Sequence, residues 1–162
     1  MSTDHKTVPE EKIRQILTWV GVSQQLLVTR FNRALKGTDL PFAQFTMLNH
    51  FFSRPGEGWT VTRLASAFET GQPGISKIVR RLVDKGYLRI EPDPEDGRVK
   101  FHYMTDQGMA RYREALARLL PEAGLIFGDW NGEDLDALHS GLFRLKSWLD
   151  DNRETRPDGA GD

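Results

Sequence analysis

The chain of 162 residues contains no cysteine. Disulfide bonds, thiolate metal sites and oxidation sensing through cysteine are therefore excluded. The sequence also lacks any apolar run that approaches the roughly 18 residues of a membrane span. Its first twelve residues, MSTDHKTVPEEK, lack the apolar core of a signal peptide. We therefore expect a cytoplasmic protein that does not enter membranes.

Catalytic signatures are missing as well. The sequence has no Gly-x-Ser-x-Gly, no His-Glu-x-x-His and no Walker loop. Residues 56–58, GEG, begin like a dinucleotide-binding loop, but Val61 occupies the position of the third glycine. The four histidines, His5, His50, His102 and His139, are scattered, and each is expected to be structural or solvent-exposed and not a metal ligand. We expect neither an enzyme nor a protein with a metal or another cofactor.

The net charge is small, −1 at pH 7, but it is unevenly distributed. Residues 54–104 contain nine Lys or Arg and seven Asp or Glu, and residues 72–86 contain four cations and one acidic residue. Local basicity of this kind suits contact with phosphate groups, even where the whole chain is slightly acidic.

Residues 72–86 predict an amphipathic helix. At about 100° per residue, one half of the helical wheel is apolar and contains Ile75, Ile78, Val79, Leu82 and Val83. The other half is polar and contains Pro73, Ser76, Lys77, Arg80, Arg81 and Asp84. Pro73 suits the first turn of this helix, and Gly86 suits its end. A basic helix on its own is more often simply solvated, so the segment that follows decides the interpretation.

That segment predicts a β-hairpin. Residues 87–90 and 99–104 alternate as strands do, and residues 92–97, PDPEDG, are rich in turn formers. The cations Arg89, Arg98 and Lys100 flank the tip, whose acidic residues are expected to hold the arginine by local ion pairs. Upstream, Thr60 caps a short helix over residues 60–68, and residues 69–71 turn into the basic helix. Together these elements predict a winged helix-turn-helix, a unit that reads double-stranded DNA.

Helices are predicted on both sides of this unit. The first, about residues 9–36, carries apolar residues at 3/4 spacing, interrupted by Gln24: Ile13, Ile16, Leu17, Val20, Leu27, Phe31 and Leu35. The last is capped by Asn131 and repeats leucine in a coiled-coil-like seam of Leu135, Leu138, Leu142, Leu145 and Leu149. We expect residues 1–39 and 106–151 to dimerise, residues 40–105 to form the winged unit and residues 152–162 to be a disordered tail. Packing within one chain is the alternative for the flanking helices.

The sequence resembles the MarR family of bacterial transcriptional regulators over roughly residues 10–150. Asp96-Gly97-Arg98 followed by Thr105 matches the wing of the family. Residues 82–88, LVDKGYL, resemble the exit of its recognition helix, and residues 40–48, LPFAQFTML, the entry of its second helix. Arg63 departs from the acidic residue usual at its position. The fifth helix is expected to be kinked or split by Pro121, Gly124 and Gly128.

The resemblance implies a mainly α fold with a small hairpin wing, assembled as a homodimer. On the exposed face of the recognition helix, base edges are within reach of Gln72, Ser76, Lys77 and Arg80, and Arg81 is placed for a phosphate. In the family the arginine that matches Arg98 reaches the minor groove or the backbone beside it, oriented by the aspartate that matches Asp96; Lys100 is a further candidate for DNA contact. Family members bind small aromatic acids and other lipophilic compounds between the dimer helices and the winged lobe. The candidates for such a crevice, with plain core packing as the alternative, are Trp19, Phe45, His50, Phe51 and Tyr112.

The sequence therefore predicts a homodimeric DNA-binding transcriptional regulator, a repressor that binds a pseudo-palindromic operator and is released by a small ligand. The alternative is a winged-helix protein-interaction module that does not bind DNA, for which the acidic wing tip is the best support. Arg80 together with Arg98 distinguishes the two, because a protein-binding wing needs no matched cations on helix and hairpin.

Overall fold

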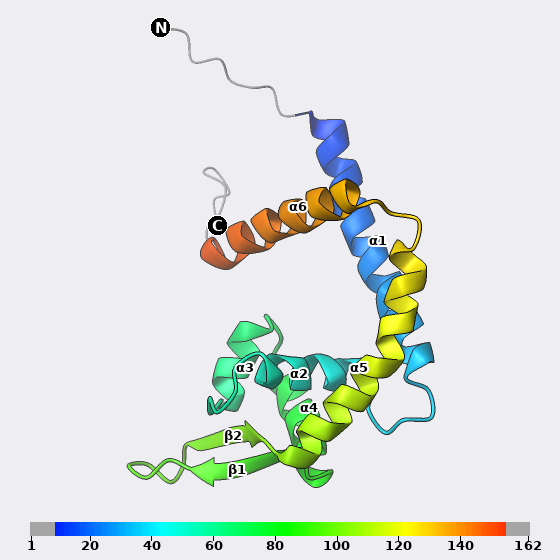
Figure 1. Cartoon of the computed structure of the whole chain (residues 1–162). Helices are drawn as coiled ribbons and strands as arrows, with labels where there is room; N and C mark the ends of the chain where they lie inside the picture. Colours follow the sequence, from blue (N-terminus) through cyan, green and yellow to red (C-terminus); the bar gives the residue numbers. More distant parts are fainter. Residues whose placement is uncertain (1–8, 155–162) are drawn as a thin grey trace, which may run out of the picture. The chain divides into compact units, whose positions relative to one another are not determined.

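The computed structural model describes residues 9–154. It contains the helices α1 (Glu10–Ala34), α2 (Phe42–Phe52), α3 (Val61–Ala67), α4 (Gln72–Asp84), α5 (Asp106–Phe127) and α6 (Gly132–Asp151). The strands β1 (Leu88–Pro92) and β2 (Lys100–Met104) form one antiparallel hairpin between α4 and α5 (Figure 1). The mainly helical fold with a hairpin wing is confirmed. His5 and most of the predicted tail, residues 155–162, lie outside the described residues.

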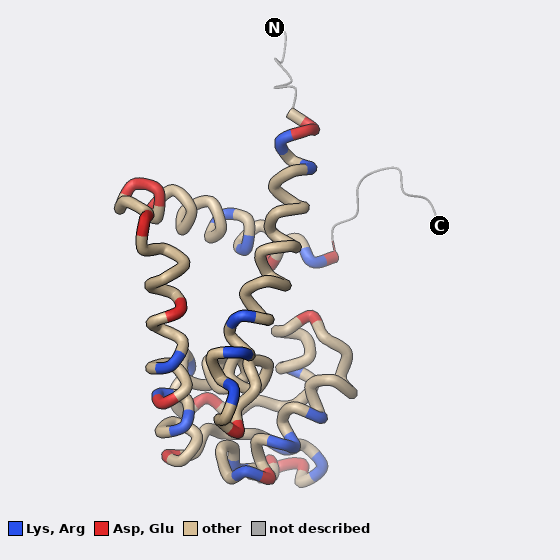
Figure 2. The backbone as a smooth tube through the Cα atoms, turned by 90° about the vertical axis from the view of Figure 1, so that its right-hand side faces the viewer, with Lys and Arg blue, Asp and Glu red and all other residues tan. Residues whose placement is uncertain are grey.

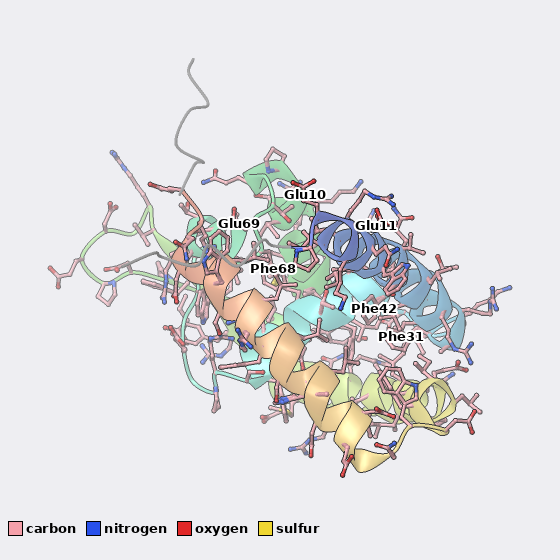
Figure 3. The ribbon with its side chains drawn as sticks, turned by 90° about the horizontal axis from the view of Figure 1, so that it is seen from above. Glu10, Glu11, Phe31, Phe42, Phe68 and Glu69 are labelled. Carbon is pink, nitrogen blue, oxygen red and sulfur yellow. The ribbon has the colours of Figure 1, made fainter. Side chains whose placement is uncertain are left out.

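The chain divides into two compact units, residues 1–123 and residues 124–162. The core of the first unit gathers α2, α3, α4, the hairpin, the end of α1 and the start of α5. Its fully buried side chains include Leu40, Leu48, Leu64 and Leu82. At the junction of α1 and α2, the rings of Phe31 and Phe42 lie side by side with their centroids 5.1 Å apart (Figure 3). None of the helices in the described part is long and apolar enough to cross a membrane.

The predicted boundaries of the helix-turn-helix are confirmed. The side chain of Thr60 accepts a hydrogen bond from the backbone N–H of Arg63 at 3.2 Å, as an N-cap does. Glu69 turns the chain between α3 and α4 with a φ of 48°. Gly86 ends the recognition helix α4 with a φ of 74°, a conformation that glycine adopts without a steric penalty. The second helix of the motif is thus fixed at both ends by local chemistry.

The hairpin is anchored on the helices through its second strand. Trp59, just before α3, pairs with His102 of β2 through two backbone hydrogen bonds of 3.1 and 2.9 Å. His102 is buried and its Nδ1 lies 3.0 Å from the Trp59 carbonyl oxygen, so this histidine has a structural role. The strand boundaries differ from those expected. β1 is Leu88–Pro92, so Pro92 pairs with Lys100 and does not belong to the turn, and β2 begins at Lys100 and not at Val99. The hydrogen-bonded pair at this end of the hairpin is Asp93 and Val99, because the Asp93 N–H donates to the Val99 carbonyl oxygen. Hydrogen-bonded pairs alternate along an antiparallel ladder, so the missing N–H of Pro92 breaks no hydrogen bond.

Of the two effects expected for the fifth helix, a kink or a split, the split does not occur. α5 continues through Pro121 and Gly124 and ends at Phe127, immediately before Gly128. Proline removes one backbone donor, but the neighbouring hydrogen bonds of a long helix can hold it together.

The second unit contains α6, which begins as predicted. The Asn131 side chain accepts from the backbone N–H of Asp134 at 2.8 Å, and Glu133 lies in the first turn. No residue of α6, all of which is described, is buried in the single chain. Of its predicted leucine seam, Leu135, Leu142 and Leu149 are exposed.

Candidate nucleic-acid interface

The buried face of α4 determines which of its residues point outward. Ile75, Val79 and Leu82 are buried, as the helical wheel predicts. The opposite face is open: Ser76 is half-buried, and the exposed residues are Gln72, Lys77, Arg80 and Arg81. Within residues 9–154, none of the three cations on this face forms an ion pair. Figure 2 shows Lys and Arg positions gathered at the lower end of the first unit, where Figure 1 places α4 and the hairpin.

The start of α4 is tied to the preceding helix. The Gln72 side-chain amide donates to the Thr62 hydroxyl oxygen at 3.1 Å, and this contact joins α3 to α4. The amide of Gln72 therefore has one end held by the protein and the other end exposed. That is the arrangement a base-reading side chain needs, because an ordered donor or acceptor loses less entropy on binding.

The wing presents Arg98 differently from the way we predicted. The expected ion pair between the acidic tip and the arginine is wrong: no ion pair to the Arg98 guanidinium occurs among the described residues. Asp96 Oδ1 instead accepts from the backbone N–H of Arg98 at 3.0 Å. Asp93 Oδ1 accepts from the backbone N–H groups of Glu95 at 2.7 Å and Asp96 at 3.3 Å. The carboxylates shape the turn, and the exposed guanidinium of Arg98 is left available.

Arg89 and Lys100 lie on opposite faces of the hairpin. Arg89 is opposite Tyr103 and lies over its ring at 4.6 Å, and it also pairs with Glu91. Lys100 pairs with Pro92, so its side chain lies on the other face of the hairpin. This side chain is exposed and forms no ion pair in the described part of the chain. The open cations of the wing are therefore Arg98 and Lys100, while Arg89 is occupied on its own strand.

The residues predicted to line a ligand crevice are only partly brought together. Phe45 and Tyr112 are buried and stacked, with ring centroids 5.2 Å apart, and the Tyr112 hydroxyl donates to Asn49. His50 lies edge-on beside Phe51. Trp19 is 63% exposed on α1 and has no ring contact within residues 9–154. A cavity of about 120 Å³ is lined by Phe51 but by none of the other four. The ligand site remains a prediction.

His50 is held in its neutral form. Its Nδ1 lies 3.3 Å from a guanidinium nitrogen of Arg54, which can only donate, so Nδ1 accepts and Nε2 carries the proton. Burial, together with the charges of Arg54 and Arg63, lowers the pKa of His50 below its usual value, and Glu57 opposes this effect only in part. Nε2 is buried without a hydrogen-bond partner among the described residues. The ring packs edge-on against Trp59 at 4.3 Å.

Sequence reasoning missed two groups of interactions. Arg63 forms an ion pair with Glu57 at 2.8 Å and lies over the Trp59 ring at 4.1 Å, so a cation at this position does find partners. A second group joins Tyr87 to Asp39 and Arg111. The nearby Glu57 could have indicated the first pair. Nothing local indicated the second, because its members are 24 or more positions apart.

The fold and the open cations define a winged helix-turn-helix protein with a basic recognition face. Residues 38–99 match the sequence model of the MarR family. The chain is 32% identical over 89 residues to the uncharacterised HTH-type transcriptional regulator YdcH of Bacillus subtilis, a match that covers 54% of this chain and 60% of that protein. The chain thus spans about three fifths of the length of this relative. Over residues 38–99, the sequence is therefore similar to the MarR family.

Solved structures share the fold over most of the chain. The transcriptional regulator BldR from Sulfolobus solfataricus has a TM-score of 0.76 at 22% identity, covering 87% of this chain and 99% of its own. Apo MarR from E. coli has a TM-score of 0.68 at 18% identity, covering 87% and 98%. A mutant of E. coli MarR complexed with operator DNA has a TM-score of 0.70 at 18% identity, covering 86% and 99%.

Proposed function

We propose that this protein is a homodimeric DNA-binding transcriptional regulator, a repressor whose operator is pseudo-palindromic. The proposal depends on one observation: two sets of exposed cations lie on neighbouring elements, the recognition helix α4 and the wing. Lys77, Arg80 and Arg81 project from α4, and Arg98 and Lys100 flank the tip of the wing, all exposed. Cations without protein partners can neutralise phosphates and release counterions, which supplies much of the affinity for duplex DNA.

Each residue then has a distinct role. α4 enters the major groove, where Arg80 makes a bidentate contact with guanine and Gln72, Ser76 and Lys77 reach neighbouring base edges. Arg81, further round the helix, and Lys100 contact phosphates. Arg98 enters the minor groove, where a narrow A·T segment concentrates negative potential.

Exposed apolar side chains on the outer helices support the homodimer. In the single chain, no residue of α1 is buried, and α1 exposes large apolar side chains, among them Leu17 and Leu26. α6 likewise exposes Leu142, Phe143 and Trp148. Exposed apolar side chains gathered on one element often mark a surface that binds another protein chain. Two recognition helices in such a dimer meet half-sites about one helical turn, roughly 10 bp, apart.

The proposal includes release from DNA by a small aromatic or lipophilic ligand. Phe52 is exposed and stacks on the Tyr112 ring at 4.6 Å, so it offers aromatic surface for such a ligand beside the buried pair Phe45 and Tyr112. A loss of operator affinity on adding salicylate, as a simple aromatic acid, would support this part of the proposal. Unchanged affinity would count against release by salicylate and leave the proposed DNA binding intact.

A salt titration of duplex binding tests the function. Duplexes are first selected from a random pool with the full chain, and the affinity of the selected duplex is measured between low and moderate salt. We expect a steep loss of affinity with salt for the wild-type protein and a much weaker complex for the double variant Arg80→Ala, Arg98→Ala. Arg113→Ala is the matched control, because Arg113 is an exposed cation of α5. Wild-type protein that binds no duplex at low salt would refute the proposal and favour the protein-interaction module.

A further inference from the structure

Tyr87, the residue immediately before β1, is the centre of a polar cluster at the C-terminal end of the recognition helix. Its side chain is 2% exposed. The hydroxyl donates to Asp39 Oδ2 at 2.5 Å and accepts from Arg111 Nε at 3.0 Å. Arg111 Nε also lies 3.4 Å from Asp39 Oδ1, which closes a triangle of three side chains. We call Asp39, Tyr87 and Arg111 the Tyr87 joint.

The joint connects three separate parts of the first unit. Asp39 lies between α1 and α2, Tyr87 follows the recognition helix, and Arg111 lies in the second turn of α5. Lys85, the C-cap of α4, adds a second link: its Nζ donates to the Asp39 carbonyl oxygen and, at 2.7 Å, to Oε1 of the buried Gln44. The end of α4 is therefore tied both to the loop before α2 and to α2 itself.

The first turn of α5 is seated on the same residue. The Thr105 N–H donates to the Tyr87 carbonyl oxygen at 3.1 Å, and the Thr105 hydroxyl donates to the Gly86 carbonyl oxygen at 2.6 Å. Gly108 permits this approach, because a Cβ at its position would lie 2.2 Å from the Tyr87 carbonyl oxygen. Both the backbone and the side chain of Tyr87 thus determine the direction in which α5 leaves the winged unit.

The charge states of the joint persist at neutral pH. Burial, reinforced by the hydrogen bond to Asp39, raises the pKa of the Tyr87 hydroxyl, which keeps it protonated and able to donate. Burial alone would raise the pKa of Asp39, but the Tyr87 hydrogen bond and the charges of Arg111 and Lys85 together bring it below its ordinary value. Hydrogen bonds to charged groups are stronger than neutral ones, so the two charged partners Asp39 and Arg111 hold the buried Tyr87 hydroxyl in place.

We propose that the Tyr87 joint is a positioning device that fixes α5 relative to the recognition helix and so sets the half-site spacing that the dimer accepts. This inference rests on the proposed function. α5 continues along the chain towards α6 and has 22 residues, a length of about 33 Å. A tilt of about 6° at the base of such a rod moves its far end by roughly 3 Å, about the rise of one base pair. A loosened joint therefore weakens the preference of the dimer for one half-site spacing, while the exposed face of α4 stays unchanged.

Tyr87→Phe tests the joint, because it removes the hydroxyl and keeps the buried ring. The full chain is titrated with the selected operator, with operators lengthened or shortened by one base pair between half-sites, and with a single half-site. We expect half-site affinity to stay within about twofold of wild type, while the preference for the natural spacing falls on the order of tenfold. Tyr103→Phe is the matched control, because the described chain gives the Tyr103 hydroxyl no hydrogen bond.

Asp39→Ala is the second variant, because it removes the carboxylate that accepts from the Tyr87 hydroxyl and pairs with Arg111. It should reproduce the loss of spacing preference even if Tyr87→Phe folds poorly, which circular dichroism would reveal. Unchanged spacing preference in both folded variants would overturn the joint while leaving the proposed function intact. Equal losses on half-site and full operator would also overturn it, since they would mean that α4 itself is distorted. Wild-type protein that binds no duplex would overturn the proposed function and this inference together.

Discussion

Replacement of Gly108 by alanine tests how closely α5 is seated on the wing. The added Cβ would lie 2.2 Å from the Tyr87 carbonyl oxygen and 3.0 Å from its carbonyl carbon. Both are backbone atoms, so no flexible side chain can move aside. Either the first turn of α5 or the segment at Tyr87 must shift by about 1 Å to restore ordinary van der Waals contact.

The expected magnitude follows from two opposing effects. Overpacking of a close contact costs about 1–3 kcal/mol, while a glycine-to-alanine change within a helix contributes up to about 1 kcal/mol of stability. We expect Gly108→Ala to lower the free energy of unfolding by about 1–2 kcal/mol. Gly124 lies in the same helix with no heavy atom within 4 Å of its ideal Cβ. Gly124→Ala should therefore raise the free energy of unfolding by about 0.5–1 kcal/mol.

Urea denaturation followed by circular dichroism measures both variants. All proteins must be compared at one concentration, because the stability of a dimer depends on it. The free energies of unfolding of the two variants should differ by about 1.5–3 kcal/mol, with opposite signs relative to wild type. Gly108→Ala that is as stable as Gly124→Ala would show that α5 does not press on the Tyr87 carbonyl, and the Tyr87 joint would lose its backbone support.

Three further predictions concern the wing, the seam and His50. Arg98→Ala should weaken operator binding, leave the melting temperature nearly unchanged and lower the salt slope by about 0.9 for each wing; wild-type affinity would remove the wing from the interface. Leu142→Asp with Leu145→Asp should place charge in the seam and give monomers, whereas a dimer on sedimentation would show that the interface lies elsewhere. Because the pKa of His50 is lowered on folding, the unfolded chain binds the proton more readily below pH 6.5, and stability should fall as the pH drops from 7.5 to 5. His50→Gln should reduce that loss relative to His139→Gln, and identical pH profiles would contradict the buried neutral ring.

The features that sequence could predict are those determined within a few residues. The cap at Thr60 and the turn at Gly86 depend on the backbone one or two turns away, and both are found where expected. The buried and exposed faces of α4 follow from its 3.6-residue period alone. The candidate DNA-contacting residues on α4 were all selected from this period.

The features that sequence could not predict depend on distant segments. Tyr87 and Asp39 are 48 positions apart, and no local pattern pairs them. The aromatic residues proposed for a ligand crevice all lie on predicted helices, but which rings meet depends on helix packing, which separates Trp19 from the stacked Phe45 and Tyr112. A local rule can also mislead: proline and glycine predicted a kink or a split in α5, and the helix is not split.

The acidic wing tip bears most directly on the choice between DNA and a protein partner. From the sequence alone, the acidic tip is an argument against DNA binding, because carboxylates repel phosphates. In the structure, Asp93 and Asp96 both accept hydrogen bonds from backbone N–H groups of the turn that carries Arg98. Their charge is partly compensated by those donors, and it holds the main chain of the turn in place. The acidic tip is therefore compatible with the proposed DNA-binding wing, because Asp93 and Asp96 hold the turn from which Arg98 is exposed.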